Sequence, residues 1–384
     1  MLRRDQHEII CNLSKPNVNG GNGMMEIGVF LPIARNGYLI SSASPQYSPT
    51  YDLNRDVAIA AERYGFDFAL AMIKLRGYGG VTRHWDECLE AFTLTSALAA
   101  VTTRIRFFPS VAVLTMPPPF AARMVATIDS VAPGRCGINI VSGWQKAEYE
   151  QMGIWPGEDH FRRRYQYCAE YTQILQELWE TGKSDFKGQF FQMDDCRLGP
   201  LPSGKMEIVC AGQSDSGIKF AAKYGDYNFI SGSCINEPHK VAPSIARLVA
   251  EAKAAGRDCG ALVLSLVIAE ETADAAFAKW ERYKAGADLE ALARRASQAG
   301  ADTSAGADSN INRFKAEGAT LPANMVSFIG AYADVAAMLD TMAQIDGVHG
   351  VMLVFDDYIE GIEKFGKFIQ PLMKSRARIA KAVA

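Results

Sequence analysis

The chain has 384 residues, of which 48% are hydrophobic and 22% charged, and it carries a formal net charge of −3. This composition is that of an ordinary globular protein with a large core, and its interleaved charges leave no basic stripe that would bind nucleic acid. No apolar run approaches the roughly 20 residues of a membrane-spanning helix.

Cysteine and histidine positions give no disulfide or metal pattern. The eight cysteines form no C-x-x-C pair and the five histidines form no H-x-x-x-H pair. Several cysteines, such as Cys136 and Cys210, lie in apolar strand-like runs, where a free thiol behaves as a small hydrophobe. We therefore expect reduced thiols, a cytoplasmic location and no metal site.

Apolar runs rich in β-branched residues alternate with segments of helical spacing along most of the chain. The predicted strands are 25–33, 68–72, 104–114, 136–141, 206–211, 227–231, 261–269 and 350–355. The predicted helices are 52–64, 86–101, 120–130, 161–180, 215–224, 241–254, 273–285, 333–343 and 359–372. Within the third strand, Pro109-Ser110 is expected to interrupt the pairing.

Three segments fall outside this alternation. Residues 1–23 lack periodicity and are expected to be a disordered N-terminal extension. Residues 183–204 are an irregular excursion with a hairpin around Phe190-Phe191, and 285–322, rich in Ala, Gly, Asp and Ser, are a second excursion or a mobile lid. Eight strand–helix units with such insertions favour a single (β/α)8 TIM barrel domain over residues 24–384. The absence of G-x-G-x-x-G after the first strand weighs against an open dinucleotide-binding sheet.

The stretch 138–157, INIVSGWQKAEYEQMGIWPG, is the leading candidate for a functional loop. It begins as a buried-looking strand, turns at Ser142-Gly143 and then carries many polar and aromatic side chains. Loops that follow barrel strands build the active site in such folds. A surface loop anchored by its two tryptophans is the alternative.

Two helix starts are candidates for binding a phosphate. Ser214 follows a strand and precedes a helix, where free N–H groups attract anions, although simple helix capping is the plainer explanation. Arg162-Arg163-Arg164-Tyr165 opens the long helix, where three positive charges oppose the helix dipole and a nearby anion would relieve the conflict. The alternative is a charge run in contact with water.

Three further positions lie where strands end or within them. Lys74 and Arg76 follow the second strand, with Gly77, Gly79 and Gly80 placed to let the backbone approach a flat ligand; a flexible turn is the alternative. Asn139 lies inside an apolar strand, where a buried amide needs a partner. Ser110 occupies a similar place in the third strand, unless Pro109 simply bends it. Such a set of polar groups and aromatics leaves difficult chemistry to an organic cofactor.

Several segments together carry a resemblance to a known family: IGVFLPI, FALAMIKLRGYGG, GKSDFKGQFF, CAGQSDSG and the long block from VLTMPPPF through GIWPG. They closely resemble the pyrimidine-degrading members of the bacterial-luciferase-like flavin monooxygenases. The resemblance runs from about Met25 to the C-terminus. It implies a luciferase-like TIM barrel that binds FMN through Ile73, Lys74, Asn139, Glu148, Arg164, Tyr165 and Ser214. Ser110 and Asn139 are the expected catalytic pair, with Ser110 standing where the family pattern has threonine.

The resemblance also implies a reaction. Reduced FMN, supplied by a separate flavin reductase that uses NADH or NADPH, and O2 would open the uracil or thymine ring between N3 and C4. The product from uracil would be ureidoacrylate or its peracid, a step in pyrimidine nitrogen catabolism, and the enzyme is expected to be a homo-oligomer. One alternative is a luciferase-like monooxygenase for another small substrate such as an alkanesulfonate. Another is a flavin-binding protein without turnover.

Overall fold

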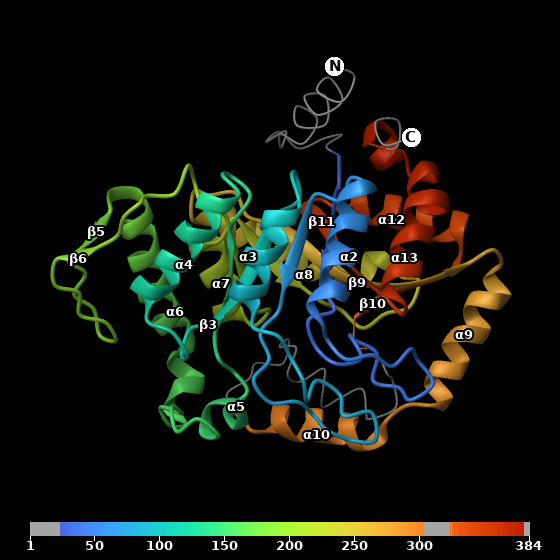
Figure 1. The fold of residues 1–384 in the computed structure, drawn as a ribbon, viewed down its shortest axis with the longest axis horizontal. Coiled ribbons are helices and arrows are strands. Elements are labelled where there is room, and N and C mark those ends of the chain that lie inside the picture. The colour runs from blue at the N-terminus through green and yellow to red at the C-terminus, as the bar shows by residue number, and fades with distance from the viewer. Residues whose placement is uncertain (1–23, 303–322, 324, 380–384) are drawn as a thin grey trace.

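The structure is a computed structural model that describes residues 24–302, 323 and 325–379 (Figure 1). The predicted N-terminal extension, residues 1–23, lies outside the described residues, as does most of the second excursion from residue 303 onward.

Eight parallel strands close into a barrel, which confirms the predicted fold class (Figure 1). Pairing runs in the order β9-β11-β1-β2-β3-β4-β7-β8, and β8 pairs with β9 to complete the ring. All eight barrel strands were predicted, with ends that differ by a few residues. Their bounds are β1 Glu26–Phe30, β2 Phe68–Ala71, β3 Arg106–Ala112, β4 Ile138–Val141, β7 Ile208–Ala211, β8 Tyr227–Ile230, β9 Gly260–Glu270 and β11 Val348–Phe355.

A ninth strand, β10 (Val326–Ala331), was not predicted. It pairs with the second half of β9, from Val326↔Ser265 to Ala331↔Glu270, whereas β8 pairs with the first residues of β9. Its six residues run directly into the next helix without a turn signal, which hides the strand in the sequence. The predicted interruption of the third strand is wrong: β3 continues through Pro109, which pairs in register with Ala71.

Helices cover the outside of the barrel, as Figure 1 shows. They are α2 Tyr51–Arg63, α3 Ala91–Val101, α4 Pro118–Val131, α6 Asp159–Thr181, α7 Asp215–Tyr224, α8 Ala242–Ala254, α9 Ala273–Ala285, α12 Tyr332–Ala343 and α13 Tyr358–Lys364. Helix α3 begins later than predicted, because the Glu90 carboxylate caps it by accepting from the Phe92 and Thr93 N–H groups. The last is shorter than predicted and continues as a π-helical turn over Phe365–Ile369 and a 3₁₀ turn over Gln370–Leu372.

The two excursions have structure of their own. The first contains a short antiparallel pair, β5 (Lys183–Ser184) and β6 (Cys196–Arg197), and a Lys187↔Gln192 bridge that confirms the predicted hairpin. The described part of the second is not irregular: it forms the helix α10, Leu289–Gly300. Asp288 caps α10 and also accepts from Thr82 Oγ1 at 2.7 Å, and Ala291 and Leu292 pack against Ile40 and Tyr78. α10 is thereby fixed to the loops after β1 and β2.

Buried and half-buried ion pairs close the end of the barrel at which the strands begin. Arg106 joins Glu26 and Glu207 at 2.5 Å each, and His349 Nε2 lies 3.4 Å from Glu26. Arg376, from the C-terminal segment, pairs with Asp67 at 2.6 Å and is fully buried. We assign these ion pairs to stabilising the fold, because the active sites of such barrels lie at the opposite end.

Acid titration should expose the contribution of Glu26. Burial alone raises the pKa of its carboxyl, but Arg106 and His349 outweigh burial and lower the pKa from 4.5 to about 2. Such a carboxylate stabilises the fold above its unfolded pKa and loses that contribution as the pH falls through the folded pKa. We expect Glu26→Gln to lower the free energy of unfolding at pH 7, with the difference from wild type shrinking between pH 4.5 and 2. Denaturant titrations at each pH would measure this, and a difference that stays constant would contradict it.

Candidate active site

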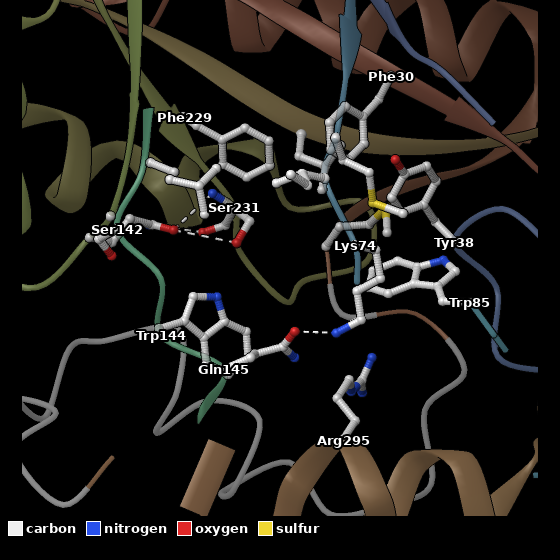
Figure 2. A pocket seen from close by; sticks show the side chains of 18 of the residues that line it. Phe30, Tyr38, Lys74, Trp85, Ser142, Trp144, Gln145, Phe229, Ser231 and Arg295 are labelled. Atoms are coloured by element: carbon white, nitrogen blue, oxygen red, sulfur yellow. Dashed lines mark hydrogen bonds between the residues drawn. The ribbon is translucent and has the colours of Figure 1, made fainter. Parts of the chain in front are cut away.

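A cavity of about 260 Å³ opens at the end of the barrel where the strands finish. Its walls come from the segments that directly follow β1, β2, β4, β7 and β8, with one side formed by α10 (Figure 2). This is the catalytic end of a (β/α)8 barrel. The lining residues are Phe30, Tyr38, Ile40, Met72, Ile73, Lys74, Tyr78, His84, Trp85, Val141, Ser142, Trp144, Gln145, Arg164, Tyr165, Ala211, Gly212, Gln213, Ser214, Phe229, Ser231, Leu264, Arg295 and Met325.

Lys74 is the centre of a buried polar network on one wall. Its ammonium pairs with Glu148 at 2.7 Å and donates to the Gln145 amide oxygen, while Gln145 Nε2 donates to the Tyr78 hydroxyl at 2.6 Å. The ammonium also lies 4.3 Å from the centre of the Tyr78 ring. Both ends of the ion pair are nearly inaccessible to water, at 3% and 8% exposure. A lysine has three N–H donors, and these contacts among the described residues use two of them, which leaves one for a ligand.

Aromatic rings frame the rest of the cavity. Phe30 stacks on Tyr38 with ring centres 4.6 Å apart, Phe229 lies 5.6 Å from Phe30, and Trp85 meets Tyr38 edge-on at 5.6 Å. Figure 2 shows Trp144 on the opposite side of the cavity from Trp85. Rings that lock one another in this way form a slot suited to flat heterocycles and keep water out.

The start of α7 forms a tight cradle with the predicted Tyr165. Ser214 caps the helix by accepting from Gly217 N, and the Tyr165 hydroxyl lies against the same turn, 2.7 Å from where a Cβ on Gly217 would stand. Gly212 has φ +142°, and a Cβ there would lie 2.2 Å from the Tyr165 hydroxyl, so the backbone must be glycine. Burial raises the pKa of Tyr165, which keeps its phenol a neutral donor. Helix N–H groups and two hydroxyls therefore meet where an anion would be stabilised.

Arg164 reaches the cavity from α6, but its two arginine neighbours do not. Arg164 Nη1 pairs with Asp302 Oδ2 at 2.6 Å, with both side chains buried, and Arg164 Nε has no partner among the described residues. Arg162 and Arg163 instead pair with Asp159 on the outside of the helix. The sequence left open whether this run binds an anion or faces water, and the structure divides it: Arg164 lines the cavity, Arg163 is half-buried and Arg162 is exposed.

Ser110 and Asn139 are brought together as register partners on β3 and β4. Asn139 Nδ2 donates to Ser110 Oγ at 2.7 Å, and Asn139 Oδ1 is buried without a partner in the described part of the chain. Neither residue lines the cavity, but Val141, two residues beyond Asn139 on the same face of the strand, does. The pair therefore lies one layer deeper in the barrel than the cavity wall.

Two expectations for the loop after β2 are wrong. Arg76 is exposed and does not line the cavity. The glycines make room for protein rather than for a ligand: a Cβ on Gly79 would meet Arg294 at 2.1 Å, and one on Gly80 would meet Asp288 at 2.4 Å. They allow α10 to seat against the loop.

The turn at Ser142-Gly143 is as predicted, with Gly143 at φ +75°. His160 Nε2 bonds to the carbonyl oxygens of Ser142 and Gly143 at 2.9 and 3.1 Å. It thereby fixes the start of the loop that carries Trp144, Gln145 and Glu148. The cavity groups that were not predicted include Tyr78, His84, Trp85 and Arg295. The nearness of the first three to the glycine-rich turn was the available signal, whereas Arg295 comes from an element that the sequence did not indicate.

Among the described residues, no helix has the length and apolar character needed to cross a membrane, and no three His, Cys, Asp or Glu side chains group as metal ligands would. The seven cysteines in this part of the chain are free thiols.

Known proteins resemble this chain over most of its length. The family model for luciferase-like monooxygenases matches residues 25–347. Pyrimidine monooxygenase RutA of Serratia proteamaculans is 56% identical over 360 residues, covering 94% of this chain and 98% of that protein. RutA of Escherichia coli O1:K1 is 55% identical over 356 residues, covering 93% of each chain. Among solved structures, riboflavin lyase RcaE, with modified FMN and riboflavin, has a TM-score of 0.78 at 18% identity, covering 92% of each chain. Long-chain alkane monooxygenase LadA has a TM-score of 0.74 at 19% identity, covering 94% of this chain and 96% of that one. These two structures show the likeness of the fold.

Proposed function

The chain belongs to the luciferase-like monooxygenase family, and from that membership we propose that it is an FMN-dependent pyrimidine monooxygenase. Its substrates would be uracil and thymine, with O2 as co-substrate and reduced FMN delivered by a separate NAD(P)H-dependent flavin reductase. The observation that carries the proposal is identity of 55–56% to proteins named pyrimidine monooxygenase over 93–94% of the chain. We further propose that residues 24–384 act as one domain and that the enzyme is a homo-oligomer.

The residues present fit FMN at both of its ends. A phosphate would sit at the start of α7, held by Ser214, Tyr165 and Arg164. The buried Arg164 Nε without a described partner, and the glycine required at 212, support an anion there. Ile73 and Lys74 would border the flavin ring in the aromatic slot, with Glu148 fixing Lys74 and Asn139 lying beneath the floor.

When bound, reduced FMN supplies with O2 the oxidising power that opens the pyrimidine ring between N3 and C4. The protein's own residues orient and enclose the reactants. The remaining Lys74 donor can stabilise negative charge that develops on a carbonyl oxygen, in a wall dry enough to make that interaction strong. The aromatic frame excludes water, which favours ring opening over unproductive loss of oxidant.

A coupled assay tests the proposal: this protein, FMN, a generic flavin reductase, NADH, O2 and uracil, with products identified by mass spectrometry. We expect ureidoacrylate, or its peracid, only when uracil, the reductase and this protein are all present. Peroxide formed while uracil stays intact would overturn the substrate, and sulfite released from an alkanesulfonate would assign the enzyme to the alternative substrate class. Binding of FMN without any substrate-dependent consumption of O2 would point to a flavin carrier.

The Ser110–Asn139 pair should affect turnover more than cofactor binding. Asn139→Ala removes the amide and leaves the Ser110 hydroxyl buried without its partner, a loss of about 1–3 kcal/mol, or about ten- to a hundredfold if it falls on the transition state. We expect kcat for ring opening to fall by that factor, with more peroxide released per turnover. Ser110→Ala should have a smaller effect, and Ser110→Thr, which keeps the hydroxyl, should retain activity. Full ring-opening activity with tight FMN binding in both alanine variants would contradict a role for the pair.

A further inference from the structure

His84 is a buried polar residue in the cavity wall that the proposed function does not use. It lines the cavity at 1% exposure, and its Nδ1 has no hydrogen-bond partner among the described residues. Its ring stacks on Trp85 at 5.0 Å and lies parallel to Tyr78 within 7°. Because Nδ1 is shut off from solvent, a ligand in the cavity would meet the other nitrogen, Nε2, for which the described residues supply no hydrogen bond either.

The backbone around His84 is held under strain. Arg83 and Trp85, on either side, adopt left-handed φ values of +51° and +61°, a region that non-glycine residues seldom enter. The turn is fixed by the Gly79↔His84 bridge and by Thr82, whose N–H donates to Asp288 at 2.8 Å. Strained residues that the surroundings hold in place cluster at ligand sites. The turn thus presents the imidazole in a fixed orientation.

The positive charges of Arg295 and Lys74 both act on the His84 imidazole. Burial, first, and then the charges of Arg295 and Lys74 lower the pKa of His84 to about 3, so the ring is neutral and keeps a lone pair near pH 7. Lys74 shares the Tyr78 and Trp85 rings with His84, since its ammonium lies 4.3 and 5.7 Å from their centres. In Figure 2, Arg295 extends from α10 into the cavity on the side of Lys74.

We propose that Lys74, His84 and Arg295 form a donor–acceptor–donor row that recognises a cyclic imide, the –CO–NH–CO– edge of the substrate. The two cations donate to the carbonyl oxygens, and the neutral imidazole accepts from the N–H between them. This inference rests on the proposed function and narrows its substrate class. Uracil and thymine present the matching acceptor–donor–acceptor edge at O2, N3–H and O4. Cytosine does not, because its N3 is an acceptor and its C4 substituent a donor.

Two methylated pyrimidines separate the imide edge from the rest of the ring. 1-Methyluracil keeps the imide edge. 3-Methyluracil, which has the same size and composition, carries its methyl group on N3 and so lacks the central N–H donor. Because methylation at N3 could also block ring opening, the comparison uses inhibition constants against uracil rather than turnover. We expect 1-methyluracil to bind wild-type enzyme at least about tenfold more tightly than 3-methyluracil. The first ligand donates a hydrogen bond to the His84 imidazole, whereas the second leaves that acceptor without a partner.

Substitutions at His84 and Arg295 then test whether these residues cause the difference in affinity between the two methyluracils. His84→Phe keeps a stacking ring but loses the acceptor, so the KM for uracil should rise about tenfold and the two inhibitors should become nearly equal, mainly because 1-methyluracil binds less well. His84→Gln, which retains an acceptor, should restore part of the preference. Arg295→Met should raise KM similarly. Arg162→Met, at an arginine of α6 that is 73% exposed and paired with Asp159, serves as the control and should behave as wild type.

The outcomes separate this inference from the function on which it rests. If wild type opens uracil but His84→Phe keeps the full preference for 1-methyluracil, the row is wrong and the function stands. Flavin carries the same imide edge in its own pyrimidine ring, so the dissociation constant for FMN is measured for each variant. A loss of FMN affinity with an unchanged KM for uracil would mean that the three residues bind the flavin ring. It would overturn their assignment to the substrate. If wild type does not open uracil, the proposed function fails. The preference for 1-methyluracil over 3-methyluracil, measured directly as binding, then decides the row alone.

Discussion

Replacing Arg164 with alanine is expected to weaken FMN binding at least about a hundredfold, which corresponds to roughly 3 kcal/mol. In the proposed site, the variant would lose the charge-assisted hydrogen bonds to the phosphate. It would also lose the positive charge that lies 2.6 Å from the Asp302 carboxylate and would offset an incoming dianion. Titration of FMN by fluorescence quenching measures the effect directly and does not depend on turnover.

Two further variants define what Arg164 does. Arg162→Ala, on the same helix but 73% exposed and paired with Asp159, should bind FMN as wild type does. Arg164→Ala combined with Asp302→Asn removes the buried negative charge as well as the guanidinium, yet should remain weak for FMN. Unchanged affinity in the single variant would place the phosphate elsewhere. Restored affinity in the double variant would mean that Asp302, rather than loss of the guanidinium, caused the defect.

Loss of Arg376 should produce the largest fall in stability, about 3–5 kcal/mol, because removing one partner of a buried ion pair leaves an uncompensated charge. Arg376 is fully buried, pairs with Asp67 and donates to the carbonyl oxygens of Gly65 and Met25 at 2.5 and 3.2 Å. We expect Arg376→Ala to shift the denaturant midpoint accordingly, with kcat of the folded protein unchanged because the site lies at the other end of the barrel.

Arg378, exposed and two residues further on, is the matched control, and Arg378→Ala should leave the midpoint where it is. Adding Asp67→Asn to Arg376→Ala should recover part of the lost stability, since the buried carboxylate is then neutral. If Arg376→Ala unfolds at the wild-type denaturant concentration, the C-terminal segment does not contribute to closing the barrel.

The spacing of apolar residues and the alternation of strands and helices made the barrel predictable. Each barrel strand is an apolar run buried on both faces, and each helix has a stripe of core residues. β10 and α10 escaped prediction because their packing partners, the end of β9 and the loop around Thr82, are distant in sequence. At the site, Lys74, Arg164, Tyr165 and Ser214 lie at strand ends or helix starts, where fold class fixes position. His84 and Arg295 reach the cavity, and Asp302 reaches Arg164, only through the seating of α10 on a strained turn, which no local pattern encodes.

The position of β1 beside β11 sets the order of events during synthesis. β1 pairs with β2 on one side and, on the other, with β11, which is made more than three hundred residues later. At about 5–20 residues per second, the ribosome takes on the order of tens of seconds to deliver that partner. Throughout this interval one edge of the nascent sheet is unpaired, and an open edge invites association with other chains. Nascent chains of this protein are therefore expected to need chaperone protection until their last strand emerges.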